Sequence, residues 1–317
     1  MATTNFKVKK RPAILVPYDF GPKAIAALDE AIKITKYLKG EIYLLSVVRK
    51  GDFFSNLFRS EKESRKLIRE TLVQLKDIAK KVKLETGTFT HITVEQGNPI
   101  EIILEQASLI GAQYIVMGKM EKSTIEFNFV GPSTLHVVGE APCPVITVSA
   151  NTIKEDGFKN IVLPIDLSKQ THEKVIKAIS WAKYYHANIH LIGVLTGKIK
   201  SSNSRLAAKM EKAKWIVQQE GLECSAEVYE MSSKPIHQII LEHADKVNGD
   251  LLMIMTHQEL SVVDNYIGAV AQKILKQADI PVISFTSKAV EDKNYFVSGF
   301  LPFQMLTNKK EIEYLRG

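Results

Sequence analysis

Residues 14–19 read ILVPYD and residues 161–166 read IVLPID. Each is a short apolar run that ends in proline and aspartate, which indicates a buried strand followed by a turn. A segment of helical periodicity follows each run, KAIAALDEAIKITKYL at 23–38 and KVIKAISWAKYY at 174–185. The chain therefore contains an internal repeat, and the repeat unit decides the fold.

The correspondence extends through the rest of both copies. NPIEIILEQASLIGAQYIVMG at 98–118 matches KPIHQIILEHADKVNGDLLMIMT at 234–256. Each segment carries a proline where the first turn of a helix tolerates it. GPSTLHVVGEAPCPVITVS at 131–149 likewise matches GAVAQKILKQADIPVISFT at 268–286.

Strands that alternate with helices predict an α/β fold with a parallel sheet and helices on both faces. We expect two tandem doubly wound domains of five strands each, at 1–151 and 152–289, and a C-terminal tail at 290–317. Ligands of such sheets lie beyond the carboxyl ends of the strands. The loops that begin at Asp19, Val48 and Gly118 would meet there.

The last strand of each copy, PVITV or PVISF, would be an exposed edge that invites pairing with another sheet. We therefore expect the two copies to pair with each other within the chain, and we also expect a homodimer. The tail contains FVSGFLPFQML at 296–306, a segment too apolar for a disordered terminus. It is expected to pack on the body or on a second subunit.

Composition excludes several classes of protein. The 317 residues are 45% hydrophobic and 24% charged, and no apolar run approaches the roughly 20 residues that span a membrane. The net charge of +7 forms no basic stripe, so a nucleic-acid partner is not expected. Two cysteines make no disulfide framework, which favours a cytoplasmic protein without membrane contacts.

No phosphate-loop, dinucleotide-binding or serine-hydrolase motif occurs, and the eight histidines lack metal-ligand spacing. The strongest candidate is the segment after the fourth strand of the first copy. Gly118 ends that strand, and Gly131 precedes a helix whose first turn holds Ser133 and Thr134; Lys119 and Lys122 add positive charge. A helix N-terminus suits a phosphate, but ordinary turn chemistry explains the same glycines.

Asp19 has alternatives of the same kind. Its carboxylate could accept hydrogen bonds from an adenine amino group or from a ribose hydroxyl. It could equally cap the following helix or close an Asx turn.

The repeated motifs make both halves similar to the universal stress protein family. They are ILVPYD and IVLPID, GNPIEIIL, YIVMG and CPVITV, and the resemblance covers nearly all of residues 12–287. It implies an adenine nucleotide alpha hydrolase-like fold and ATP or AMP as ligand, with no metal beyond a nucleotide-associated Mg²⁺. The implied contacts are Asp19 and the backbone of Val47 at the adenine end, and Gly118, Gly131 and Ser133 at the ribose and phosphates. Pro17, Tyr18, Met117, Lys119 and Thr134 complete the expected nucleotide site.

The family's glycine pattern is altered in both copies. In the first, Glu121 replaces a glycine and brings negative charge, and Pro132 removes an N–H donor. In the second, alignment of the motifs puts Thr256 in place of the first glycine and Ala269 in place of the hydroxyl residue. The second copy is therefore predicted not to bind ATP.

Three functions stay open. The first is a non-catalytic stress-response protein that binds a nucleotide in the first domain only. The second is an interaction scaffold that has lost the ligand, and the third is a weak ATPase, for which the sequence shows no positioned base, nucleophile or metal set.

Overall fold

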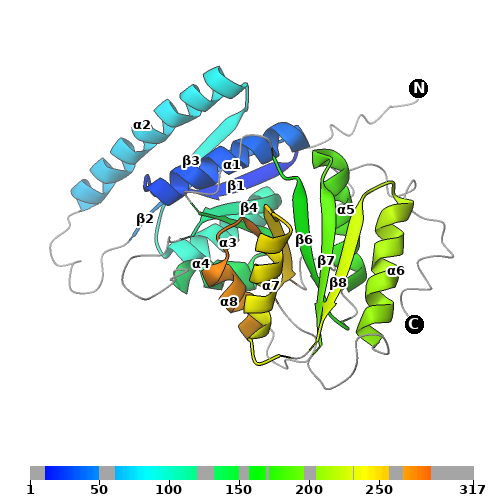
Figure 1. Cartoon of the computed structure of the whole chain (residues 1–317). Helices are drawn as coiled ribbons and strands as arrows, with labels where there is room; N and C mark the ends of the chain where they lie inside the picture. The colour runs from blue at the N-terminus through cyan, green and yellow to red at the C-terminus, as the bar shows by residue number, and fades with distance from the viewer. Residues whose placement is uncertain are drawn as a thin grey trace, which may run out of the picture.

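The computed structural model describes residues 11–49, 61–119, 132–149, 157–168, 171–195, 205–230, 232–256 and 267–286. All ten strands of this part of the chain join one sheet, in the order β3-β2-β1-β4-β5-β10-β9-β6-β7-β8 (Figure 1). Every neighbouring pair is parallel except the central one, β5 with β10. The predicted α/β class and the two doubly wound halves are confirmed.

Each half alternates strand and helix along the chain. The first half contains β1 (Ala13–Pro17), α1 (Pro22–Leu38), β2 (Glu41–Val48), α2 (Glu61–Thr86), β3 (Thr90–Gln96), α3 (Pro99–Ile110), β4 (Ala112–Gly118), α4 (Pro132–Glu140) and β5 (Val145–Val148). The second contains β6 (Asn160–Ile165), α5 (Thr171–Tyr185), β7 (Asn188–Val194), α6 (Arg205–Gln219), β8 (Cys224–Tyr229), α7 (Ile236–Lys246), β9 (Leu251–Met255), α8 (Ala269–Gln277) and β10 (Val282–Phe285). The predicted boundary near residue 151 and the tail at 290–317 lie outside the described residues.

Two hydrophobic cores cover the two faces of the sheet. One is formed with α1, α2, α5 and α6, and the other with α3, α4, α7 and α8. Each core contains buried side chains from both halves, so the halves share their interior. Burial of this apolar surface is the main force that holds them together.

The antiparallel pair β5–β10 marks a pseudo-twofold axis. Ile146 faces Ile283, and each is the isoleucine of a Pro-Val-Ile sequence at the same position of its repeat. Tyr37 of α1 stacks on Tyr184 of α5, and these residues lie equally far after Asp19 and Asp166. A residue that contacts its own equivalent lies on a twofold axis, so both contacts locate the same axis.

An aromatic cluster surrounds Trp181 beside this axis. The indole is 1% exposed, and its Nε1 donates a hydrogen bond to Tyr114 Oη of the first half at 3.2 Å. Tyr37, Phe158 and Tyr185 pack around the same indole. Trp181 therefore packs in the contact between the halves, where its large ring is buried and its N–H has a hydrogen-bond acceptor.

We predict that Trp181→Ala lowers the free energy of unfolding by about 3–5 kcal/mol, because it leaves a cavity and removes the donor to Tyr114. Trp215 on α6 is 48% exposed, and Trp215→Ala is expected to cost about 1 kcal/mol or less. Urea denaturation followed by circular dichroism measures both. Equal losses in the two variants would contradict this role of Trp181.

Candidate functional site

The carboxyl ends of β1, β2 and β4 lie side by side, because β1 pairs with β2 on one side and with β4 on the other. This end of the sheet brings together Pro17, Tyr18 and Asp19 after β1, Val47 on β2, and Met117 to Lys119 at the end of β4. It is the edge at which an α/β sheet of this type holds its ligand. These predicted site residues therefore share one region of the fold.

Asp19 closes an Asx turn. Its Oδ1 accepts a hydrogen bond from the backbone N–H of Gly21 at 3.0 Å, and the intervening Phe20 has a φ of 65°. No side-chain hydrogen bond caps α1, so the Asx turn, rather than a helix cap, is the local task of this carboxylate. Asp19 itself is exposed to solvent at the end of β1. The carboxylate of Asp19 is therefore open to solvent.

Gly118 has a steric reason to be glycine. A Cβ at this position would lie 2.4 Å from the backbone oxygen of Lys23, near the start of α1. A side chain cannot occupy that space unless the backbone moves, so the close approach of α1 to β4 requires a residue without one. The glycine is thus explained by packing of the chain on itself, whatever ligand the site takes.

Lys119 points toward the second half. It is 2% exposed, its backbone N–H donates to Val148 O at 2.7 Å, and its Nζ donates to the carbonyl oxygen of Ala278 at the end of α8. Across the axis, Thr286 Oγ1 donates to the carbonyl of Ala141 at 3.2 Å. Ala141 and Ala278 occupy equivalent positions of the repeat. In this structure the Lys119 ammonium therefore connects the halves.

The phosphate end of the predicted site is only partly described. Pro132 begins α4 as the sequence indicates, and in its first turn Ser133 is half-buried and Thr134 is buried. Glu121, Lys122 and Gly131 lie outside the described residues.

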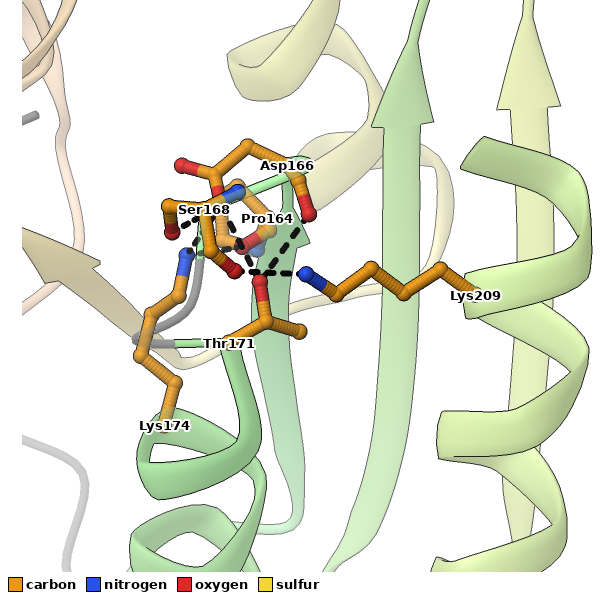
Figure 2. A network of polar contacts seen from close by, with 6 residues as sticks. All are labelled: Pro164, Asp166, Ser168, Thr171, Lys174 and Lys209. Atoms are coloured by element: carbon orange, nitrogen blue, oxygen red, sulfur yellow. Dashed lines mark hydrogen bonds and ion pairs between the residues drawn. The ribbon is translucent and has the colours of Figure 1, made fainter. Parts of the chain in front are cut away.

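In the second half, side chains of the chain itself contact one carboxylate oxygen of Asp166, the counterpart of Asp19 (Figure 2). Its Oδ1 accepts hydrogen bonds from Ser168 N at 3.1 Å, from Ser168 Oγ at 2.5 Å and from Thr171 Oγ1 at 3.0 Å. Lys174 Nζ lies 3.7 Å from the same oxygen and donates to Pro164 O at 2.9 Å. Lys209, on α6, donates to Ser168 O at 2.5 Å.

The charges of this network support one another. Burial alone would raise the pKa of Asp166, but the Lys174 ammonium and the hydrogen bonds from Ser168 and Thr171 outweigh it and hold that pKa below its usual value. Burial lowers the pKa of Lys174, and the Asp166 carboxylate offsets part of that effect. Removal of either partner would therefore leave the other charge uncompensated.

Sequence reasoning missed this network, although the signal was present. Thr171 and Lys174 stand three residues apart on one face of α5, where the first copy has the buried Ala24 and Ala27. Both copies have an aspartate just before this helix, and polar residues that replace alanines on the helix face near it indicate side chains that contact the aspartate.

Strand pairing corrects the alignment of the second copy. Gly118 pairs with Val148 and Met255 pairs with Phe285, and Val148 and Phe285 are equivalent positions. Met255, and not Thr256, therefore occupies the position of the first glycine. Thr256 matches Lys119 instead: its N–H donates to Phe285 O at 3.0 Å, as that of Lys119 does to Val148 O. The prediction was wrong by one residue because the connection before β9 is longer than the one before β4.

Among the described residues, no three histidine, cysteine, aspartate or glutamate side chains are grouped so that they could hold a metal ion. None of the described helices is both long and apolar enough to cross a membrane.

The lowered pKa of Asp166 predicts a pH-dependent effect of Asp166→Asn on stability. A folded-state pKa below the unfolded value near 3.9 means that this carboxylate stabilises the fold above about pH 4 and ceases to do so as the pH falls through its folded pKa. We expect Asp166→Asn to cost about 1–3 kcal/mol at pH 7, because Lys174 loses its counter-charge and a strong acceptor is replaced.

Urea denaturation at pH 7 and in acid tests this prediction. The difference from the parent chain should shrink in acid, and Asp19→Asn, which keeps the oxygen of the exposed Asx turn, should cost less than about 1 kcal/mol at pH 7. A difference that is the same at both pH values would refute the assignment to the carboxylate charge.

A sequence model of the Universal stress protein family matches residues 11–149 and 157–285. A universal stress protein of Methanocaldococcus jannaschii is 31% identical over 140 residues, which are 43% of this chain and 80% of that protein. Among solved structures, a universal stress protein of Archaeoglobus fulgidus aligns with a TM-score of 0.71 at 18% identity, over 87% of this chain and 97% of the other. A putative universal stress protein of Pseudomonas aeruginosa aligns with a TM-score of 0.65 at 16% identity, over 89% and 95%. The chain belongs to the universal stress protein family and carries two tandem copies of its domain.

Proposed function

We propose that this chain is a non-catalytic stress-response protein that binds an adenine nucleotide, ATP or AMP, in its first half only. The observation that carries the proposal is the difference between two equivalent aspartates. Asp19 is exposed and closes one Asx turn, whereas Asp166 accepts bonds from Ser168 and Thr171 and lies beside the ammonium of Lys174.

In the second half, a nucleotide would have to compete with this network. An adenine amino group that approached Asp166 Oδ1 would displace hydroxyl and backbone donors already at hydrogen-bond distance. Displacement of Lys174, which is 3% exposed, would leave a buried ammonium without its carboxylate. The side chains of the second half thus fill the role that a ligand would have.

In the first half, we propose the following contacts. Asp19 would accept from the adenine amino group or a ribose hydroxyl, and the backbone of Val47 would meet the base. Pro17, Tyr18 and Met117 lie at the ends of the adjacent strands and would line the site. The first turn of α4, with Ser133 and Thr134, would direct N–H groups and the positive end of the helix dipole toward the phosphates. Any Mg²⁺ would arrive with the nucleotide.

A ligand-free interaction scaffold is the second candidate, and one observation favours it. The ammonium of Lys119, a residue of the expected nucleotide site, connects the halves and therefore has a structural task. We propose that both functions take place in the cytoplasm and in a homodimer. A weak ATPase is the third and least supported candidate.

Calorimetric titration with ATP and with AMP separates the candidates. We expect one nucleotide per chain in the parent protein, and about tenfold to hundredfold weaker binding in Asp19→Ala, because a charge-assisted hydrogen bond contributes about 1.5–3 kcal/mol. Asp166→Ala is the matched control and should keep the parent affinity.

Absence of binding in the parent protein would favour the scaffold. Two sites per chain, or a loss of affinity in Asp166→Ala alone, would contradict the assignment to the first half. Phosphate release above background that disappears in Asp19→Ala would establish the ATPase.

A further inference from the structure

A second group of polar side chains lies at the amino ends of β6, β7 and β8, at the opposite end of these strands from Asp166. The imidazole of His190, on β7, lies between the side chains of Asn160 and Ser225. Its Nδ1 lies 2.8 Å from Ser225 Oγ on β8, and its Nε2 lies 3.1 Å from Asn160 Oδ1 on β6. Serine, histidine and a side-chain carbonyl in this order are the elements of an activated nucleophile.

The hydrogen bonds determine which atom carries each proton. The Asn160 Nδ2 donates to the backbone carbonyl of Asn248 at 3.2 Å, and a carbonyl can only accept. The amide oxygen of Asn160 must therefore face His190, whose Nε2 then carries the proton. Because Nδ1 is left with its lone pair, the hydroxyl of Ser225 has to donate to it. This is the tautomer in which a histidine accepts a proton from serine.

Asn160 is itself held in place. The carboxylate of Asp250, 5% exposed, accepts from the backbone N–H groups of Lys159 at 2.8 Å and Asn160 at 3.0 Å. The Asn188 amide also donates to Asn160 Oδ1 at 3.5 Å. Asp250, just before β9, therefore fixes the backbone of Asn160, and the Asn160 side chain in turn orients the imidazole of His190.

The charge state and the exposure of the group suit the same task. Burial lowers the pKa of His190, and the nearby Asp250 carboxylate offsets this in part, so the neutral imidazole is favoured. His243 of α7 also interacts electrostatically with His190. Ser225 is exposed and lies on β8, the last strand of the described sheet, so a reagent can approach its hydroxyl from solvent.

We propose that Ser225 is a nucleophile, activated by His190 and positioned by Asn160, that accepts an acyl group from an activated acyl ester. The Ser225 Oγ forms a bond to the acyl carbon while its proton passes to His190 Nδ1. The bond between the acyl carbon and the leaving oxygen breaks, and the proton on Nδ1 then neutralises that oxygen. The products are an acyl ester of Ser225 and the free alcohol or phenol.

These hydrogen bonds also join neighbouring strands, so the test must separate reactivity from structure. The full chain is treated with p-nitrophenyl acetate, p-nitrophenolate release is followed at several pH values, and acetylated peptides are identified by mass spectrometry. Positioned general bases contribute about 10²–10⁴-fold, so Ser225 should be acetylated at least about tenfold faster than the exposed Ser108 of α3.

Three variants test the individual roles. Ser225→Ala should remove the adduct, and His190→Gln should slow its formation at least about tenfold. Asn160→Asp should move the midpoint of the pH–rate profile upward, because a carboxylate stabilises the imidazolium, and a merely structural role of Asn160 would leave that profile unmoved. Ser108→Ala is the control. Equal labelling of Ser225 and Ser108, or an unchanged rate in a folded His190→Gln variant, would overturn the proposal.

Discussion

The antiparallel pairing of β5 with β10 is the contact on which the rest of the molecule depends. Each of these strands would otherwise end a parallel sheet with an open row of backbone groups. Because Ile146 faces Ile283 across the pair, the two five-stranded halves become one sheet with a twofold relation. Residues at matching positions of the two repeats therefore lie in equivalent places, and the two copies can be compared position by position.

The comparison shows halves that share a backbone and differ in chemistry. At the axis the copies agree, as in the stacking of Tyr37 on Tyr184. At the carboxyl ends of the strands they diverge: Ala24 and Ala27 of the first copy are replaced by Thr171 and Lys174 in the second. Burial of charged side chains costs desolvation energy, so such a network is stable only where each charge has a partner. In the second half Ser168, Thr171 and Lys174 are the partners of Asp166, whereas Asp19 of the first half is exposed to solvent.

Much of the fold could be predicted from the sequence, because buried strands and amphipathic helices occur twice in the same order. ILVPYD and IVLPID placed both first strands, and Pro132 marked the start of α4. Side-chain direction could not be predicted in the same way. Lys119 looks like a phosphate ligand by its position in the chain, but its ammonium reaches Ala278, which is far away in sequence.

The alignment of the two copies at β9 also could not be predicted from the sequence. Only the pairing of the strands shows that Met255, and not Thr256, matches Gly118. The network around Asp166 needed the helix face to be known, because Thr171 and Lys174 are otherwise ordinary polar positions.

The most direct measurement is a crystal structure of the chain with ATP present. We expect nucleotide density beside Asp19 and the first turn of α4, with the hydrogen bonds from Ser168 and Thr171 to Asp166 intact. Nucleotide density beside Asp166, with Lys174 displaced, would contradict it.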